Sequence, residues 1–202
     1  MQVLLVHGMA RTTLSLAGLA RSLRRQGHEP ISTGYVAALE SFPTVRNRVR
    51  AHLDRIGEPF ACIGHSLGGL LLRSALGEAR HQPRHLIFLG TPQRSPLLAR
   101  KYRHLWPYRI VNGEMGQRLA DETFFAGLPE VLVPRTIVAG TAGRTGRWSP
   151  FGDAPNDGIV SVAETMLEPA DQPVLVDAHH TFLMNHRDVR SVIARVLPGE
   201  SY

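Results

Sequence analysis

Short apolar runs recur along the chain, each bounded by glycine, proline or polar residues. Several of them are apolar at nearly every position, which is typical of strands that are covered on both faces of a sheet. We therefore expect strands at residues 2–7, 29–36, 60–64, 85–90, 135–140 and 173–178.

Between these runs, apolar residues recur with the period of a helix. In the segment 14–27, Leu16, Leu19 and Leu23 share one face, and Gly27 stands where that helix should end. Segments 44–57 and 188–197 repeat the pattern. The alternation of strand and helix predicts an α/β fold with a mostly parallel central sheet of about six strands and helices on both faces.

One interval interrupts this alternation. Residues 92–134 form a strand-free stretch of 43 residues, in which we expect a helix at 115–128. The sequence shows no linker, repeat or low-complexity tract, so we expect residues 1–202 to form a single domain. The interval 92–134 is then a short cap-like insertion that leaves from the strand ends, where a wall of a substrate pocket could be built.

Composition narrows the classes of partner. The 202 residues, 43% of them hydrophobic, are enough to bury a sizeable core. The 23 lysines and arginines outnumber the 17 acidic residues, but they are scattered and form no block interleaved with stacking aromatics. We therefore predict a solvated basic surface and no nucleic-acid partner.

Cysteine usage and the N-terminus bear on the compartment. Cys62 is the only cysteine, so it cannot form an intramolecular disulfide, and we expect it to be a small core residue. The first residues lack the features of a signal peptide, and no window reaches the ~18 apolar residues of a membrane span. We expect a cytoplasmic protein without stable membrane insertion; a removed signal peptide and the oligomeric state stay open.

The sequence GHSLGG at residues 64–69 joins a predicted strand to an apolar helix. A tight turn of this kind strains the backbone of its middle residue and exposes that side chain above the sheet. Gly64 and Gly68 supply the small residues that the crossing backbones need. The pattern could arise by chance among 19 glycines, but the strand before it and the helix after it favour Ser66 as a nucleophile.

A serine hydroxyl needs a base to take its proton, and the base needs an acid to orient it. In this architecture the acid and then the histidine follow the serine, on loops after later strands. Asp157 follows the predicted strand 135–140, and His180 follows the strand 173–178. We therefore predict a triad of Ser66, Asp157 and His180.

From the first strand to the last helix, the sequence resembles the α/β-hydrolase superfamily, particularly small bacterial serine esterases and lipases with little or no lid. The matching pieces are VLLVHGMAR, IGHSLGG, FLGTP, NDGIVSV and HHTFLMNHRDVRSVIARVL. Two features depart from the family pattern. The chain begins at the strand bearing His7 and Gly8, without the antiparallel strands that precede it in larger members. After GTP it reads QRSP, where many lipases have a glycine-containing turn.

The resemblance also bears on the choice among histidines. His180 stands ahead of the last helix where the family's base does, whereas His179 would point to the opposite side of an extended strand. His186 follows Met-Asn, a context found around the base in some bacterial lipases, and stays an alternative. We interpret His65 as a packed residue beneath the turn that carries Ser66.

The acid has alternatives as well. Asp157 has the family's NDGIVSV context, Asp153 lies in a proline-flanked turn, and Asp177 falls inside the last strand, too near the base in sequence. The resemblance further implies an oxyanion hole formed by the backbone N–H groups of Met9 and Leu67.

These assignments predict a serine esterase that needs no metal or organic cofactor. The substrate would be a small-molecule ester or a lipid, with short or medium acyl chains favoured because the insertion is short. An acyltransferase or thioesterase with the same triad, or a non-catalytic ligand-binding protein of this fold, are the alternatives. Six residues are candidates either for an apolar acyl pocket or for plain core: Leu97, Leu98, Trp106, Phe124, Phe125 and Phe182.

Overall fold

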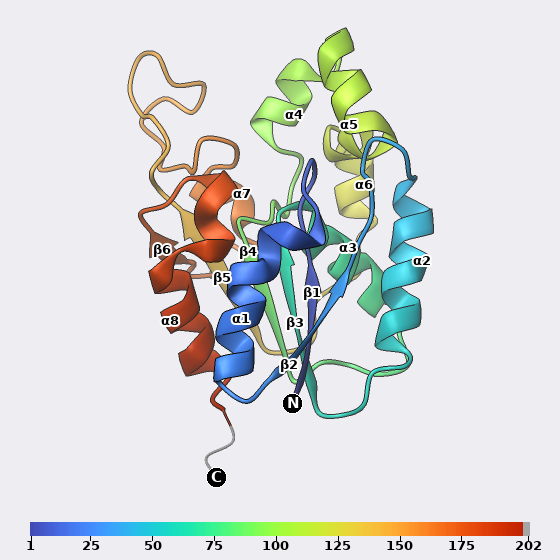
Figure 1. Ribbon diagram of the computed structural model, residues 1–202. Helices are drawn as coiled ribbons and strands as arrows, with labels where there is room; N and C mark the ends of the chain where they lie inside the picture. The colour runs from blue at the N-terminus through green and yellow to red at the C-terminus, as the bar shows by residue number, and fades with distance from the viewer. Residues whose placement is uncertain (200–202) are drawn as a thin grey trace.

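The computed structural model describes residues 1–199 and contains a six-stranded sheet at its centre (Figure 1). The strand order is β2-β1-β3-β4-β5-β6, and each neighbouring pair is parallel. The predicted α/β class is therefore confirmed, with a sheet that is parallel throughout. The strands are β1 Gln2–Val6, β2 Glu29–Thr33, β3 Phe60–His65, β4 His85–Leu89, β5 Arg135–Gly140 and β6 Val174–Val176.

Helices cover both faces of this sheet. Within residues 1–199 the α-helices are α1 Ala17–Arg25, α2 Phe42–Leu53, α3 Leu67–Leu76, α4 Leu97–Tyr102, α5 Trp106–Leu119, α6 Glu122–Ala126, α7 Val162–Thr165 and α8 Arg187–Val196. Two short 3-10 helices, η1 Thr13–Leu16 and η2 His180–Asn185, precede α1 and α8. Figure 1 shows α1 and α8 in front of the sheet at the left, and α2 and α3 at the right.

The core consists of two buried clusters that share the strands. Alternate residues of β1 belong to different clusters because side chains of a strand point to opposite faces. Leu4 packs with α2 and α3, whereas Leu5 packs with α1 and α8. Cys62 is fully buried in the first cluster, as predicted.

Differences from the sequence-based boundaries occur at the sheet edges and in the interval between β4 and β5. The edge strand β6 pairs with β5 over three residues only, and the other edge strand, β2, ends at Thr33. Edge strands have a neighbour on one side alone, so fewer hydrogen bonds extend them.

The helix expected at 115–128 is wrong as a single element. The chain breaks at Ala120 and Asp121, because the Asp121 side chain accepts a hydrogen bond from Thr123 N (2.9 Å) and caps the new helix α6. The preceding helix α5 bends at Gly113, which has a φ of 56°. The expected absence of strands between β4 and β5 holds within the described residues, and α4, α5 and α6 occupy the interval.

Parallel strands place all their carboxyl ends at one edge of the sheet. The loops that follow β1, β3, β5 and β6 therefore gather there, and α4 and α5 rise beyond the same edge (Figure 1). None of the helices within residues 1–199 is both long and apolar enough to cross a membrane.

Candidate active site

Ser66 occupies the turn between β3 and α3 in a strained backbone conformation. Its φ of 53° and ψ of −125° are rare for a residue with a side chain. Its N–H donates to Leu89 O (2.9 Å), which fixes the turn to β4. His65 and Leu67 on either side are buried, while Ser66 is partly exposed. The turn thus presents the serine hydroxyl at the carboxyl edge of the sheet and at the N-terminus of α3.

The glycines around Ser66 are required by close contacts between backbones. A Cβ atom on Gly64 would collide with the backbone of Gly69, and one on Gly68 would collide with the carbonyl oxygen of Val6. Backbone atoms cannot move aside as a flexible side chain can, so these positions accept no larger residue without a shift of β1 or α3. The sequence-based reason for both glycines is confirmed.

Asp157 and His180 form a direct hydrogen bond. His180 Nδ1 lies 2.6 Å from Asp157 Oδ2, and both side chains are nearly inaccessible. A carboxylate only accepts hydrogen bonds, so Nδ1 carries the proton and Nε2 is left with a free lone pair. The other oxygen, Asp157 Oδ1, accepts from Ile159 N (3.0 Å) and Val160 N (2.8 Å), which holds the carboxylate in its loop.

Gly90 makes room for this pair. It follows β4 with a φ of 56°, and a Cβ there would lie 3.1 Å from His180 Nδ1 and 3.2 Å from Asp157 Oδ2. The backbone of the strand next to β3 therefore packs directly against the hydrogen-bonded side chains. Gly90 N donates to Val138 O (2.8 Å), which fixes the position of this glycine.

His65 connects the serine turn to the histidine loop. Its Nε2 donates to His180 O at 3.0 Å, and the two rings lie 4.9 Å apart. Its Nδ1 is buried without a hydrogen-bond partner among residues 1–199. Burial, with a smaller contribution from nearby His180, holds the pKa of His65 well below 6.5, so this side chain is neutral. His65 is packed beneath the turn, as predicted, and it also positions the backbone of His180.

The structure therefore joins Asp157 to His180 directly and Ser66 to His180 through its neighbour His65. Within the described part of the chain, no hydrogen bond links Ser66 to His180. Catalytic hydrogen bonds of this kind are often long without substrate and tighten when it binds.

Two backbone N–H groups near Ser66 have no acceptor. Neither Met9 N nor Leu67 N donates a hydrogen bond to another of residues 1–199. Leu67 N belongs to the first residue of α3, and Met9 follows Gly8, whose Cβ would lie 2.9 Å from Ser66 Cβ. Free donors beside a serine are what a developing oxyanion requires.

The loop that bears Met9 is braced by Tyr35. The rings of Tyr35 and His7 stack at 4.2 Å, and Tyr35 Oη donates to His7 O (2.7 Å). His7 Nδ1 donates in turn to Gly8 O (2.8 Å). Burial lowers the pKa of His7, so its ring is neutral in this arrangement. The role of Tyr35 was not predicted from the sequence, because nothing in the loop after β2 indicates that its tyrosine contacts His7.

Comparison with known proteins concerns the fold. No protein-family profile and no curated protein matches this sequence. Among solved structures, an extracellular α/β-hydrolase from a Paenibacillus species aligns over 100% of both chains, with 12% identity and a TM-score of 0.66. A methylesterase from Arabidopsis covers 98% of both chains with 14% identity and a TM-score of 0.64. A thioesterase domain from the curacin biosynthetic pathway covers 96% of this chain and 89% of its own, with 14% identity and a TM-score of 0.64.

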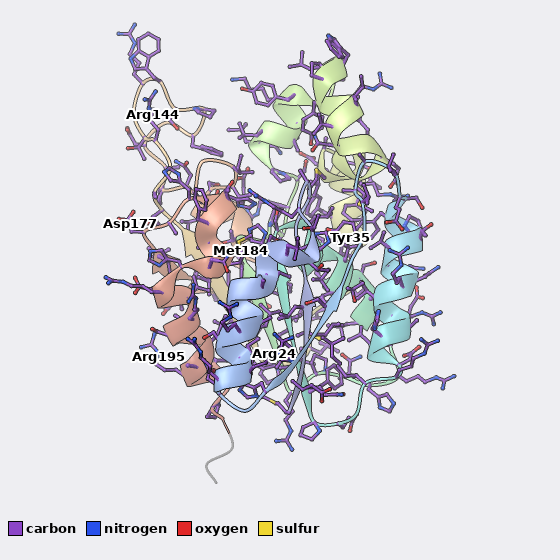
Figure 2. All side chains as sticks on the ribbon, viewed as in Figure 1. Arg24, Tyr35, Arg144, Asp177, Met184 and Arg195 are labelled. Carbon is purple, nitrogen blue, oxygen red and sulfur yellow. The ribbon has the colours of Figure 1, made fainter. Side chains whose placement is uncertain are left out.

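The chain has the α/β-hydrolase fold. The order of its candidate residues agrees with this fold, since Ser66 follows β3, Asp157 follows β5 and His180 begins η2 after β6. The alternatives lie elsewhere. Asp153 and Asp177 are exposed, and Figure 2 shows Asp177 at the outer side of the molecule near β6.

The other histidines of this α/β-hydrolase fold lie outside the pair. His179 is exposed. His186 is the N-cap of α8, where its Nδ1 accepts from Asp188 N at 3.3 Å. Neither forms a hydrogen bond with Asp157 in the described residues. In the structure, His186 therefore caps the start of α8.

The six apolar candidates for an acyl pocket divide between core and surface. Phe125 is buried, and Phe124 packs against the same cluster. Leu97 and Leu98 are half-buried. Trp106 and Phe182 are exposed by 74% and 66%. Core packing thus explains the two adjacent phenylalanines but neither Trp106 nor Phe182.

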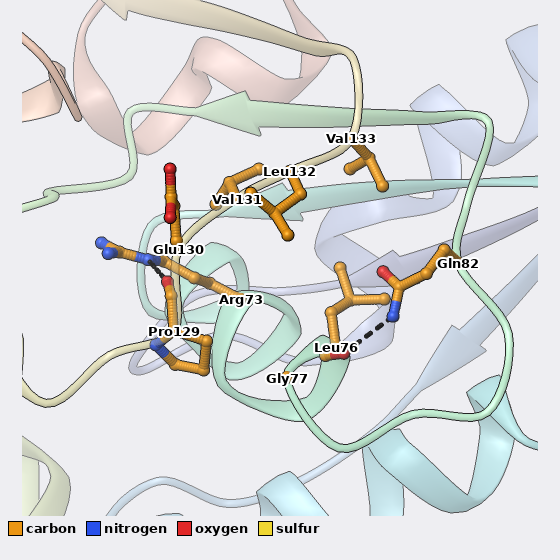
Figure 3. A pocket seen from close by; sticks show the side chains of 9 residues that line it. All are labelled: Arg73, Leu76, Gly77, Gln82, Pro129, Glu130, Val131, Leu132 and Val133. Carbon is orange, nitrogen blue, oxygen red and sulfur yellow. Dashed lines mark hydrogen bonds between the residues drawn. The ribbon is translucent and has the colours of Figure 1, made fainter.

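A pocket of about 370 Å³ lies beside the C-terminal half of α3, away from the three candidate residues (Figure 3). Figure 3 shows Arg73 at one end, where its Nε donates to Pro129 O (2.7 Å). The pocket is lined by Arg73, Leu76, Gly77, Gln82 and residues 129–133.

Within residues 1–199, no group of three or more His, Cys, Asp or Glu side chains is arranged to hold a metal ion.

Proposed function

We propose that this chain is a serine hydrolase that cleaves carboxylic esters through an acyl-enzyme on Ser66. The observation that carries the proposal is the buried hydrogen bond of 2.6 Å between His180 and Asp157, at the sheet edge where Ser66 is partly exposed on its strained turn. A strained serine on its own would also suit a turn with a purely structural role. A strained serine together with a histidine that a buried carboxylate orients is what nucleophilic catalysis needs.

In the first half-reaction, Ser66 Oγ attacks the ester carbonyl carbon while His180 Nε2 takes the hydroxyl proton. Asp157 keeps the proton on Nδ1 and stabilises the imidazolium that forms. The N–H groups of Met9 and Leu67 bind the oxyanion, and losing one such donor typically costs about 3 kcal/mol of barrier. The alcohol then leaves with the proton from Nε2, and the acyl group stays on Ser66.

In the second half-reaction, a water molecule gives its proton to His180 Nε2 and attacks the acyl-enzyme. Ser66 leaves with that proton, the carboxylic acid departs and the free enzyme returns. The chemistry uses no metal or organic cofactor, so activity should survive treatment with EDTA.

The substrate class is an accessible ester with a short or medium acyl chain. Likeness to a methylesterase and to a thioesterase domain favours ester or thioester substrates, and it establishes the fold alone. A thioester is the second candidate, because the same attack on the carbonyl carbon would release a thiol in place of an alcohol.

Covalent labelling tests the nucleophile. A fluorophosphonate should modify Ser66 and abolish hydrolysis of chromogenic esters, and Ser66→Ala should remove both the label and the activity. Ser95 and Ser161 are natural internal controls, since both are buried and donate their hydroxyls to Leu119 O (3.0 Å) and Glu164 (3.0 Å). Label on either of these serines would overturn the assignment.

The histidine is tested in the same assay. His180→Ala should fold and lose turnover by a factor on the order of a thousand or more, as loss of a triad member does elsewhere. His186→Ala should keep most of the activity, because it removes only a cap of α8. Circular dichroism must show that both variants are folded. An inactive His186→Ala beside an active His180→Ala would sink the triad.

A further inference from the structure

Two exposed segments stand beyond the carboxyl ends of the strands, at the upper right and upper left of Figure 1. The first, the α4–α5 tip, comprises residues 100–111. The second, the 144–148 loop, follows β5. Each contains one of the two tryptophans of the sequence, and Trp106 and Trp148 are exposed by 74% and 81%. Large aromatic side chains this exposed have no packing role in the protein itself.

Aliphatic residues extend the apolar surface of the α4–α5 tip. Leu105, Ile110 and Val111 are exposed by 52%, 66% and 56%. Further exposed apolar residues follow other strands and so belong to the same edge of the sheet: Leu14 after β1, Leu39 after β2 and Phe182 after β6.

Charge is concentrated in the same two places. Residues 100–111 contain four basic residues and no acidic one, and residues 144–148 contain two basic residues and no acidic one. The rest of the chain carries 17 basic and 17 acidic residues. These two segments therefore account for the whole net positive charge, and the other basic residues are scattered along the chain among the acidic ones.

Most of these cations have no acidic partner. Arg100 pairs with Glu122 at 2.9 Å. The other basic residues of the two segments form no ion pair within residues 1–199. Two of them lie over exposed aromatic rings: Lys101 Nζ is 5.6 Å from the ring centroid of Tyr102, and Arg147 Cζ is 5.4 Å from that of Trp148. The residues without an ion pair are Lys101, Arg103, Arg109, Arg144 and Arg147.

The base of the α4–α5 tip is fixed to the protein while its exposed part projects. Gly113 has a φ of 56°, and a Cβ there would lie 3.0 Å from Ala38 O in the loop after β2. Next to it, Glu114 Oε2 accepts from Phe42 N at 2.8 Å. The tip therefore presents its apolar and basic side chains on a rigid support.

We propose that the α4–α5 tip and the 144–148 loop dock the protein on an anionic lipid surface. Tryptophan has an apolar ring with one polar N–H, which suits the headgroup region, and unpaired arginines complement lipid phosphates. Both tryptophans lie on projecting segments and not in a groove, which is unlike a stacking platform for nucleic-acid bases. Docking in this way would turn the edge that bears Ser66 toward the lipid. The proposal does not rest on esterase activity.

Intrinsic fluorescence gives a direct test, because both tryptophans belong to the proposed surface. Vesicles of phosphatidylcholine with phosphatidylglycerol should shift the emission to the blue, and brominated lipids should quench it. The affinity should exceed that for pure phosphatidylcholine by about tenfold or more and should fall as salt is added. No preference for the anionic vesicles, or no shift, would overturn the proposal.

Matched double variants distinguish binding through this surface from a general effect of the net charge of the protein. Arg103→Gln with Arg109→Gln should weaken vesicle binding by on the order of tenfold. Arg24→Gln with Arg25→Gln removes the same charge from exposed residues of α1, and Figure 2 shows Arg24 at the far end of the molecule from Arg144. This control should bind nearly as the parent does. If both double variants lost the same affinity for vesicles, binding would depend on total charge alone, and the proposal would be overturned.

A third variant tests the apolar component. Ile110→Ser with Val111→Ser keeps every charge, so it should retain weak, salt-sensitive binding with a smaller blue shift than the parent shows. Ser66→Ala should bind vesicles as the parent does, and failure of the esterase proposal would leave this binding unchanged. Binding of the tip to nucleic acid or to a second copy of this chain, without binding to anionic vesicles, would overturn the lipid proposal.

Discussion

Strain at single residues is concentrated around the candidate site. Ser66 and Ala10 are the two non-glycine residues with positive φ among residues 1–199. Ser66 directly precedes Leu67, and Ala10 directly follows Met9, so each lies next to one of the two free N–H groups. Such conformations cost roughly 1–3 kcal/mol each and persist where the surrounding structure holds them. Here the surroundings are backbone contacts between β1, β3 and α3 that admit only glycine. Packing therefore stabilises a turn that the serine alone would not adopt.

Gly90→Ala should disturb catalysis more than folding. An alanine at this φ of 56° is strained by about 1 kcal/mol, and its Cβ would press on His180 Nδ1 and Asp157 Oδ2 from 3.1 and 3.2 Å. A shift of the pair by a few tenths of an ångström should lower kcat by on the order of tenfold. Steady-state kinetics on a chromogenic ester measures this loss.

Gly27→Ala is the matched control. Gly27 ends α1 with a φ of 79°, and a Cβ there would meet no atom within 4 Å. It should lose similar stability in urea and keep its kcat. Equal turnover in the two variants would mean that Gly90 does not position the pair.

His65 should make folding sensitive to acid. Burial depresses the pKa of His65 in the folded protein, so below about pH 6.5 the unfolded chain binds a proton that the native protein refuses. The free energy of unfolding is then complete above pH 6.5 and falls as the pH drops toward the folded-state pKa, by at most about 1.4 kcal/mol per pH unit for this group. Urea midpoints at pH 7.5 and 5.0 measure the loss.

His65→Gln isolates this histidine from the others. Burial also lowers the pKa values of His7, His52 and His85, which contribute in the same direction. Glutamine can still donate to His180 O but does not titrate. The variant should show a shallower fall between the two pH values. An unchanged slope would show that His65 does not resist protonation.

At the scale of elements, Glu164 connects two segments that lie far apart in sequence. Its Oε2 accepts from Ser161 N (2.8 Å), and its Oε1 accepts from Leu97 N (2.6 Å) at the start of α4. Glu164 is 8% exposed, so its removal would leave the buried Ser161 N and the part-buried Leu97 N without an acceptor.

Glu164→Ala should therefore loosen α4 as well as α7. We expect the free energy of unfolding to fall by about 2–4 kcal/mol, since hydrogen bonds to a buried charge contribute about 1.5–3 kcal/mol each. Trypsin should cut first at Arg100 and Lys101. Glu168→Ala removes an exposed carboxylate paired with Arg135 and should cost less than about 1 kcal/mol. First cleavage elsewhere in both variants would show that Glu164 does not hold α4.

The elements differ in how far sequence could predict them. The central strands are continuously apolar because helices cover both faces, so β3, β4 and β5 could be located closely. The turn at Ser66 was predictable because its glycines are required by local backbone contacts. The bracing of His7 by Tyr35 and the bond from Glu164 to Leu97 were not, since they join distant segments. The helix break at Asp121 was missed because local capping opposed a continuous apolar pattern.

At the scale of the whole molecule, the same strands support both buried clusters. Leu4 and Leu5 are adjacent in β1 but belong to different clusters. If either cluster unfolded, it would expose one face of the strands whose other face the second cluster covers. We propose on this ground that the chain is one domain and unfolds as one cooperative unit.

Leu19→Ala on α1 and Leu53→Ala on α2 test this proposal from opposite faces. Both leucines are fully buried, and each change should lower the free energy of unfolding by about 2–5 kcal/mol.

Amide exchange followed by mass spectrometry should show the same loss of protection in peptides from α1 and from α2, whichever leucine is removed. Leu132→Ala, at a residue that is 83% exposed, should change neither. Tryptophan fluorescence is the wrong probe, because Trp106 and Trp148 both lie outside the core. Protection lost only on the mutated face would show that the two layers unfold separately and that the shared strands do not couple them.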